Sequence, residues 1–561
     1  MIDSTVYVDR VSNWLHIFLT RTAEAFPELW WEIPTAVLLT VLWCGLARIF
    51  PSLFSSVAAR FSESVKHPGR YVVAAMLLPA ALRLACLPWI PPPQPKWHDE
   101  FSQLLVADTL AHGRLANPPH PLARHFETIY VLQTPTYSST YPPGQGIIMA
   151  VGEAVTGRPW AGVLVAVALM CGSITWMLNG CLPAPWAVMG GLLGTLTYGL
   201  ADEWIDSYYG GAFCAFGGAL LFGSLFRLRR SPSRGLALLA GLGWSVIWLI
   251  RPYESLHTLL FSWCFLAIFA WQDSGRWKRW ITPAALMLGV QGCAGILTAA
   301  HDRAVTGSYT TMPYQLSQRK YGVPQSFLWQ KPIQEPALNL RELKAMYEWQ
   351  RGRKDLLDQH PFRRCAAVIY NMWLFFVTPW FTLPVLMAGL LLIRDYEVRA
   401  AVALLAVAAG AGAFYPFFAA RYIAAYSGIF LYLIVRGLMV LYNRSLYGKP
   451  AVCLVVAGAC LAGPASFAIA PATLPARAQI VRELLNTPGR HAVFVRYGPT
   501  HDFHDEWVYN AADIDASRIV WCRAMGPADD AEVARYYRDR KLWLVDAGEG
   551  TGKLSPYAPG P

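Results

Sequence analysis

The stretch "WHDEFSQLLVADTLAHGR", residues 97 to 114, follows an apolar run at 71–90 that ends in the proline-rich "LPWIPPPQP". Proline has no amide hydrogen and does not continue a helix, so the prolines end this run. The acids Asp99 and Glu100 come within ten residues of the run's end. The chain thus places two adjacent carboxylates at the edge of a long apolar segment.

The composition indicates a membrane protein. Of the 561 residues, 55% are hydrophobic and only 15% are charged, whereas a typical soluble domain has about 25% charged residues. An apolar run of roughly 17–25 residues is long enough to cross the hydrocarbon core of a bilayer. The predicted spans are 33–50, 71–90, 160–178, 185–200, 211–226, 235–250, 256–271, 280–299, 366–393, 399–418, 422–440 and 450–469. The predicted fold class is therefore an α-helical polytopic membrane protein with about twelve transmembrane helices.

The loops between these spans predict an orientation. Short basic loops face the cytoplasm in membrane proteins, and here they are 51–70, 227–234, 272–279, 394–399 and 441–449. The long loops 91–159 and 301–365 and the tail then lie outside, in the periplasm if the membrane is a bacterial inner membrane. These loops also account for the net charge of +11, so no nucleic-acid partner is expected.

The C-terminal tail differs in composition from the rest of the chain. Residues 491–498, 517–525 and 541–548 read as short buried strands, and 529–540 has helical spacing. We therefore predict a small external α/β module without a glycine-rich phosphate loop. The acid- and histidine-rich stretch 500–515 is interpreted as a solvated loop. The predicted domains are 1–70 with one apolar span, 71–470 as the membrane body and 471–561 as the module.

Two interpretations of Asp99 are open. The stretch after it has helical spacing that ends near Gly113, so Asp99 could simply stabilise the start of a helix. Against this, a capping box needs its second acid three residues after the cap, whereas Glu100 directly follows Asp99. Polar residues at the ends of other apolar spans are also costly unless they pair or line a site. The candidate substrate-binding residues that would share a pocket with Asp99 and Glu100 are His98, Tyr141, Asp206, Tyr208, Arg251, Tyr253, Glu254 and Arg421.

These residue types favour one kind of chemistry. A carboxylate near an acceptor hydroxyl acts as a general base, and arginine binds phosphate through paired hydrogen bonds. Aromatic side chains stack on sugars or prenyl groups. The combination is typical of transfer of a sugar from a polyprenyl-phosphate donor to an acceptor.

Four stretches resemble the GT-C superfamily of membrane glycosyltransferases, which includes protein O-mannosyltransferases, bacterial aminoarabinose transferases and enzymes with an RgtA/B/C/D-like domain. They are "WHDEFSQLLVADTLAHGRL" (97–115), "TYSSTYPPGQG" (136–146), "DSYYGG" (206–211) and "RPYE" (251–254). By this resemblance, Asp99 matches the catalytic carboxylate and Glu100 assists it or binds the acceptor. The resemblance also implies a polyprenyl-phosphate-sugar donor, inversion at the sugar, and a glycan, lipid or protein acceptor. Arg251 and Arg421 are the phosphate candidates by position.

The likeness covers about residues 70–440. The span at 33–50 departs from it, because related enzymes usually begin with the helix that precedes the acidic loop. Either the N-terminus lies outside, or 33–50 is a helix on the membrane surface.

Several alternatives remain at the level of sequence. The chain could be a transporter or flippase of a polar lipid, or a membrane scaffold whose module binds a partner. Arg251 could pair with Glu254, and the loop 301–365 could be an acceptor-binding lid or a packed cap. Four histidines lie in one loop, but their spacing matches no metal motif, so we expect no cofactor and find no support for a divalent cation. These histidines are His98, His112, His120 and His125.

Overall fold

The computed structural model describes residues 51–559 except 201–203, 323–326, 332–334, 337, 339, 445–447, 470–473, 500 and 549–550. Before residue 51 it describes only Leu38, Val41, Gly45 and Ile49. The predicted span at 33–50 therefore lies outside the described residues.

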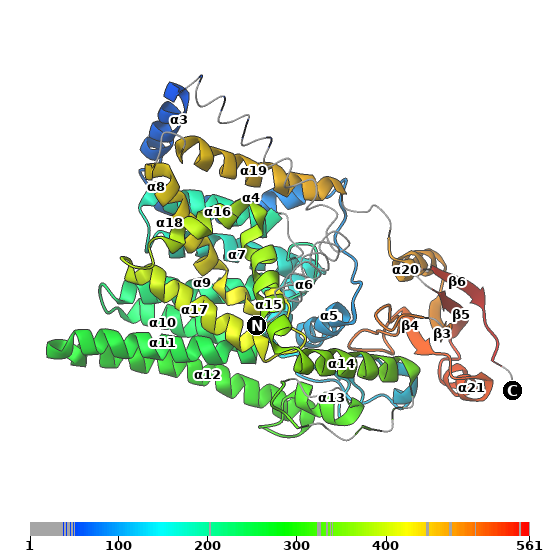
Figure 1. Ribbon diagram of the computed structural model, residues 1–561. Helices are drawn as coiled ribbons and strands as arrows, with labels where there is room; N and C mark the ends of the chain where they lie inside the picture. The colour runs from blue at the N-terminus through cyan, green and yellow to red at the C-terminus, as the bar shows by residue number, and fades with distance from the viewer. Residues whose placement is uncertain are drawn as a thin grey trace, which may run out of the picture.

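Long helices form the body of the protein (Figure 1). Seven helical stretches of the described residues are long and apolar enough to cross a membrane, so the chain is an integral membrane protein. The figure of about twelve crossings stays a prediction. The helices of the body are α3 (Pro51–Ser64), α4 (Pro68–Ala85), α6 (Gly144–Thr156), α7 (Trp160–Leu178), α8 (Ala184–Gly194), α9 (Gly211–Leu228), α10 (Arg234–Ile250), α11 (Pro252–Gln272), α12 (Ile281–Thr306), α15 (Pro361–Met372), α16 (Thr378–Gly389), α17 (Tyr396–Ala413), α18 (Ser427–Arg444) and α19 (Gly448–Ile469).

The predicted span at 366–393 corresponds to one candidate span, Pro361–Gly389, but the helix is interrupted within it. Helices α15 and α16 are separated by a π-helical turn, Trp373–Val377, and Thr378 has a positive φ of 56°. Pro379 follows directly, and its missing amide hydrogen interrupts the regular hydrogen-bond ladder. The apolar run is continuous in sequence, but the proline divides it into two helices.

The body has a buried centre and a lipid-exposed edge. Helix α9 packs against α7 and α10, and α10 packs against α12. Most of α7 and α9 is buried inside the protein, whereas α11 and α12 keep most of their apolar surface exposed. An apolar helix that is exposed along its length is stable in lipid, where its side chains need no other cover.

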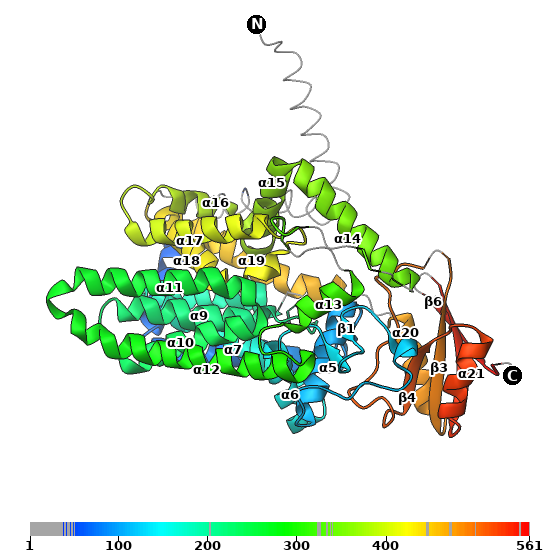
Figure 2. The same cartoon turned by 90° about the horizontal axis from the view of Figure 1, so that it is seen from below.

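The segments predicted to be external gather at one end of the body (Figures 1 and 2). Helix α14 buries Leu343 and Met346 in one apolar cluster with Ile129 and Leu132 of the first long loop. This burial favours the packed-cap interpretation of the loop 301–365. The elements at this end are α5 (His98–Ala111), the 3₁₀ turn Ala123–Phe126, β1 (Val131–Leu132), β2 (Ser138–Ser139), α13 (Pro313–Tyr321) and α14 (Arg341–Gln359).

Two glycines of "TYPPGQG" let α6 approach its neighbours closely. A Cβ atom at Gly146 would lie 2.1 Å from a methyl carbon of Val106 in α5. A Cβ at Gly144 would lie 2.6 Å from the backbone of Leu249 in α10. Glycine is required at both positions because no side chain fits, and the close contact fixes α5 against the membrane body.

The C-terminal module is a four-stranded sheet in the order β4-β3-β5-β6. The three predicted strands are confirmed, and β3 pairs in parallel with both β4 and β5. Sequence reasoning missed α20 and the antiparallel edge strand β6, whose sequence "TGKLSP" is short and largely polar. The elements are α20 (Ala476–Asn486), β3 (Arg490–Tyr497), β4 (Ile519–Arg523), α21 (Pro527–Tyr536), β5 (Arg540–Gly548) and β6 (Thr551–Pro556).

The interpretation of 500–515 as a solvated loop is wrong. Glu506, Trp507 and Val508 are buried, and the ring of Tyr509 stacks on Phe101 of α5 with centroids 4.4 Å apart. The stretch is rich in acids, but its aromatic and aliphatic residues are buried between the sheet and the first long loop. The module is thereby docked beside α5.

A buried ion-pair network joins the module to two other external segments. The Arg523 side chain is 3% exposed and donates to the carbonyl of Glu127 at 2.7 Å and to the carboxylate of Glu342 at 3.0 Å. It also donates to the buried carboxylate of Glu506. One guanidinium therefore connects the first loop, α14 and the module.

We expect Arg523→Met to destabilise the docked module strongly. The substitution leaves two buried carboxylates without their cation, which typically costs about 3–5 kcal/mol. Thermal unfolding and limited proteolysis near residue 475 measure the loss. The matched control is Arg496→Met, because Arg496 forms an exposed pair with Asp546 and exposed pairs contribute about 0–1 kcal/mol. Equal shifts in the two variants would contradict the assignment.

Candidate functional site

The acidic pair lies in the first turn of α5. The N-cap residue is Trp97, so Asp99 and Glu100 are the second and third residues of the helix. The expectation that Glu100 directly follows the cap is therefore wrong, because the helix begins two residues earlier than assumed. Glu100 lies three residues after the cap, which is where a capping acid belongs.

Glu100 holds three backbone amides. Its carboxylate accepts hydrogen bonds from the amides of Lys96 at 2.9 Å, Trp97 at 3.2 Å and Tyr208 at 3.1 Å. Burial raises the pKa of the Glu100 carboxyl, and the three amides oppose that rise. Glu100 thus fixes the start of α5 to the "DSYYGG" segment.

We expect Glu100→Ala to lower stability rather than remove a reacting group. Three backbone amides would lose their acceptor, and the buried amide of Tyr208, left unsatisfied, costs about 1–3 kcal/mol. The thermal unfolding midpoint of the purified protein measures this effect. Exposed Glu348 on α14 provides the matched control, Glu348→Ala. An unfolding midpoint that moves no more in Glu100→Ala than in the control would refute the structural role.

Asp99 is only partly buried and points its carboxylate at tyrosines. It accepts a hydrogen bond of 2.5 Å from the hydroxyl of Tyr141. Burial, followed by the charge of Asp99, raises the pKa of Tyr141 well above its ordinary value. Tyr141 therefore stays a donor to Asp99 at neutral pH.

Tyr130 and His98 complete the surroundings of Asp99. The His98 ring lies 5.0 Å from that of Tyr130, and Tyr130 lies 5.7 Å from Tyr141. Burial lowers the pKa of His98, so its ring is neutral at pH 7. Its Nδ1 is buried and has no hydrogen-bond partner among the described residues.

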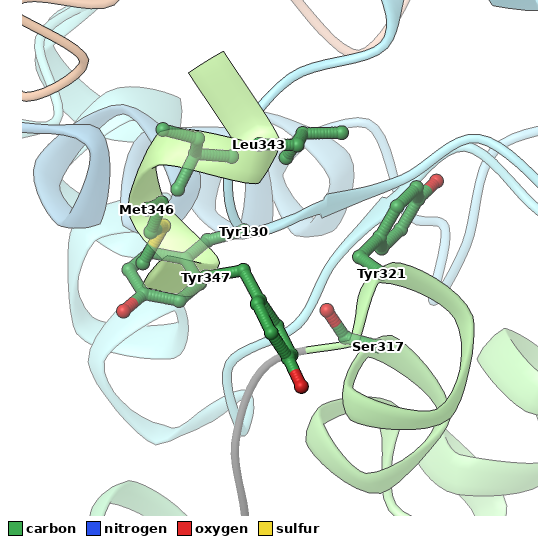
Figure 3. Close-up of a pocket in the computed structure, with 7 residues that line it drawn as sticks. Tyr130, Ser317, Tyr321, Leu343, Met346 and Tyr347 are labelled. Carbon is green, nitrogen blue, oxygen red and sulfur yellow. The ribbon is translucent and has the colours of Figure 1, made fainter. Parts of the chain in front are cut away.

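Tyr130 was missed by sequence reasoning. Its backbone has a positive φ of 58°, a conformation that costs energy for a non-glycine residue and that is common at functional sites. Figure 3 shows that Leu343 and Met346 of α14 lie beside Tyr130. The cavity there measures about 10 Å³, room for about one water molecule, so this is the packed wall behind the site. A positive φ at a tyrosine has no local signal in the sequence, so sequence reasoning could not find Tyr130.

Two arginines, Arg251 and Arg421, lie near Tyr422, which is within electrostatic reach of Asp99. The Arg251 guanidinium lies 4.7 Å above the ring of Tyr422, and that of Arg421 lies 4.4 Å above the ring of Tyr209. Aromatic faces stabilise cations in this geometry, so the rings hold positive charge close to the carboxylate.

Arg251 forms no hydrogen-bonded ion pair with an acid in any contact of the described residues. Its Nε is buried and donates to no partner there. Glu254 is within electrostatic reach of Arg251, but the predicted direct pair between the two is not formed. Glu254 instead accepts the amide of Ala425 at 2.8 Å and the thiol of Cys214 at 3.2 Å. A partly buried, unpaired guanidinium is costly, and an anionic ligand would remove that cost.

Three other candidate residues form hydrogen bonds within the protein. Asp206 accepts two hydrogen bonds, at 2.9 and 2.8 Å, from the buried guanidinium of Arg83. The hydroxyl of Tyr208 donates to the carbonyl of Pro93 at 2.9 Å, and that of Tyr253 donates to Ala411 at 2.8 Å. Together with Glu254, these side chains support the pocket from behind.

The four histidines of the first loop do not converge. Asp108 is the partner of His112, and His120 contacts Asp515 of the module. His125 instead lies near the carbonyl of Arg523. No group of three His, Cys, Asp or Glu residues suited to a metal ion occurs in the part of the chain that the structure describes.

No protein-family model and no curated protein matches this chain. Several solved structures do match this chain. The oligosaccharyltransferase of Archaeoglobus fulgidus, in a complex with zinc and sulfate, matches with a TM-score of 0.50 and 12% identity over 85% of this chain and 67% of that chain. The same archaeal enzyme, AglB, with an inhibitory peptide and a dolichol-phosphate, matches with a TM-score of 0.48 and 10% identity over 85% of this chain and 69% of that chain.

A third match is ArnT from Cupriavidus metallidurans bound to undecaprenyl phosphate, with a TM-score of 0.44 and 12% identity over 89% of this chain and 93% of that chain. At these identities the likeness establishes the fold alone. The chain shares the fold of the archaeal oligosaccharyltransferase, a fold in agreement with the helical membrane body predicted from the sequence.

Proposed function

We propose that this protein is a glycosyltransferase that moves a sugar from a polyprenyl-phosphate donor to an acceptor at the external face of the membrane. The observation that carries the proposal is the arrangement of Asp99, Tyr422 and the unpaired Arg251. An accessible carboxylate and an unpaired guanidinium within reach of one tyrosine suit a base and a leaving phosphate. The fold shared with an oligosaccharyltransferase supports this class of reaction.

Asp99 acts as the general base in this mechanism. The hydrogen bond from Tyr141 orients its carboxylate, which takes the proton of the acceptor hydroxyl. The acceptor oxygen then bonds to the anomeric carbon, and the bond from that carbon to the donor phosphate breaks. The electron pair leaves with the phosphate, and attack from the opposite face inverts the sugar, as the resemblance implies.

Arg251 and Arg421 bind the donor phosphate. Their guanidinium groups offer paired N–H donors for phosphate oxygens, and Tyr422 and Tyr209 hold them in place. Negative charge builds up on the phosphate as the bond breaks, so a fixed cation there stabilises the transition state more than the bound donor. Glu100 positions α5 rather than binding the acceptor. The steps above are written with the side chains of the protein alone.

The location is part of the proposal. Basic short loops place the opposite end of the body in the cytoplasm, so the site and the module of 471–561 lie in the periplasm of a bacterial inner membrane. The unit 71–470 carries the catalytic residues. The donor, which carries a hexose or a pentose, would enter the site from the lipid. Arg251 lies at the end of α10, and Arg421 lies between α17 and α18.

Transfer by the purified protein tests the proposal. We expect a labelled sugar to move from a polyprenyl-phosphate donor to acceptors in an envelope extract, and we expect the donor to bind without acceptor. Absence of both transfer and donor binding, across hexose and pentose donors, would refute the glycosyltransferase and leave the transporter and scaffold hypotheses.

A further inference from the structure

Three aromatic residues from distant parts of the chain meet beside Asp99. The ring of His504, from the C-terminal module, lies 6.2 Å from that of Trp97 and 5.3 Å from that of Trp349 in α14. It is nearly perpendicular to both, at 87° and 90°. We call Trp97, Trp349 and His504 the aromatic platform. Trp97 is two residues before Asp99, so the platform borders the proposed base.

The indoles of the platform are open to solvent. Trp97 is 46% exposed and Trp349 is 42% exposed, although tryptophan is usually highly buried. An exposed apolar patch bordered by polar groups marks an interaction site in soluble regions. Both rings belong to anchored segments. The backbone amide of Trp97 donates a hydrogen bond to the carboxylate of Glu100, and α14 is held by its buried apolar face. The platform is therefore preformed.

Hydrogen-bonding groups surround these rings. Asp502 accepts from the backbone amide of His504 at 3.0 Å and lies 2.9 Å from its Nδ1. This contact orients the ring and leaves Nε2 to another partner. His98 lies 5.9 Å from His504; it is 8% exposed, and its Nδ1 has no hydrogen-bond partner among the described residues. A buried ring nitrogen without a partner is costly unless a ligand or water satisfies it.

We propose that the aromatic platform binds a saccharide unit of the acceptor, so that the acceptor is a glycan. This inference rests on the proposed function and adds the class of acceptor. A sugar ring presents C–H groups on its face and hydroxyls at its edge, which matches exposed indole faces beside oriented imidazoles. One face of the Trp349 indole stacks on Phe417, with ring centroids 6.1 Å apart, so a sugar would bind the other face. A peptide or a lipid acceptor is the outcome that the product analysis below distinguishes from a glycan.

Direct binding tests the platform without relying on transfer. The full-length protein in nanodiscs is titrated with maltotriose, mannotriose and chitotriose while its tryptophan fluorescence is recorded. We expect saturable quenching by at least one of the three, and a loss of roughly tenfold or more in affinity in Trp97→Ala and in Trp349→Ala. Trp349→Phe should keep most of the binding, because the aromatic face remains. The control Trp277→Ala changes an exposed tryptophan between α11 and α12 and should bind as the wild type does. Quenching by none of the three sugars would overturn the inference.

Measuring the transfer reaction distinguishes the glycan inference from the glycosyltransferase proposal. In Trp97→Ala, Trp349→Ala and His504→Ala, we expect KM for the acceptor to rise about tenfold while donor binding stays unchanged. Linkage analysis of the labelled product should find the transferred sugar bonded to another monosaccharide. A product linked to a peptide side chain or to a non-sugar headgroup would overturn the glycan inference while the glycosyltransferase stands. If the wild-type protein does not bind the donor, that result would instead count against the glycosyltransferase proposal.

Discussion

Replacing Asp99 with asparagine is expected to abolish sugar transfer while the protein stays folded in the membrane. The amide keeps the size of the side chain and still accepts the hydrogen bond from Tyr141, but it does not take a proton. General-base catalysis contributes roughly 10²–10⁴-fold in rate, so we expect a loss of that size in kcat. Donor binding should change little, because the phosphate is held by the arginines.

The rate of transfer in single turnovers, together with the unfolding midpoint, measures this effect. The matched control is Asp355→Asn on α14, because Asp355 is exposed and contacts only Arg351 at 4.0 Å. This control removes one negative charge from the same end of the protein. If Asp99→Asn keeps the wild-type rate, Asp99 is a residue that stabilises the start of α5 and the base lies elsewhere.

Replacing Arg251 with glutamine is expected to weaken donor binding strongly. Hydrogen bonds to charged groups contribute about 1.5–3 kcal/mol, which corresponds to roughly 10–100-fold in affinity. Glu254, the acid nearest in sequence to Arg251, keeps its hydrogen bonds to the amide of Ala425 and the thiol of Cys214 when Arg251 is replaced. The fold should therefore tolerate the change, and the unfolding midpoint should move by no more than a few degrees.

Binding of a polyprenyl phosphate without sugar measures the contribution of the phosphate alone. The control Arg230→Gln removes an exposed arginine from the loop between α9 and α10, at the predicted cytoplasmic side. We expect wild-type binding in this control. An Arg251→Gln variant that binds the lipid phosphate as tightly as the control does would exclude Arg251 from the phosphate site and leave Arg421 as its candidate.

The expected result for Glu100 is different in kind. Its neighbour in sequence is the proposed base, yet Glu100 holds three amides and is buried. Sequence reasoning treated the two acids as one functional pair because it placed the helix start two residues too late. Successive residues of a helix point about 100° apart, so adjacent carboxylates face different surroundings, one the pocket and one the backbone of "DSYYGG".

The sequence by itself determined the membrane body, the position of the acidic loop at the end of an apolar run and the strands of the module. These features depend on local properties: the length of apolar runs, the helix-breaking effect of proline, and the alternation of short buried strands. The four motif stretches added the resemblance to the GT-C superfamily, and the chain shares its fold with the archaeal oligosaccharyltransferase.

Only the tertiary structure decided which polar residues are available to a substrate. Arg251 and Glu254 are three residues apart, and sequence alone allowed them to pair. In the folded protein the amide of Ala425, about 170 residues away, takes the place of Arg251 at Glu254. The placement of His504 beside Trp97 likewise follows from the docking of the module on α5. Pairing between distant segments depends on how whole helices pack, and no local pattern in the chain encodes it.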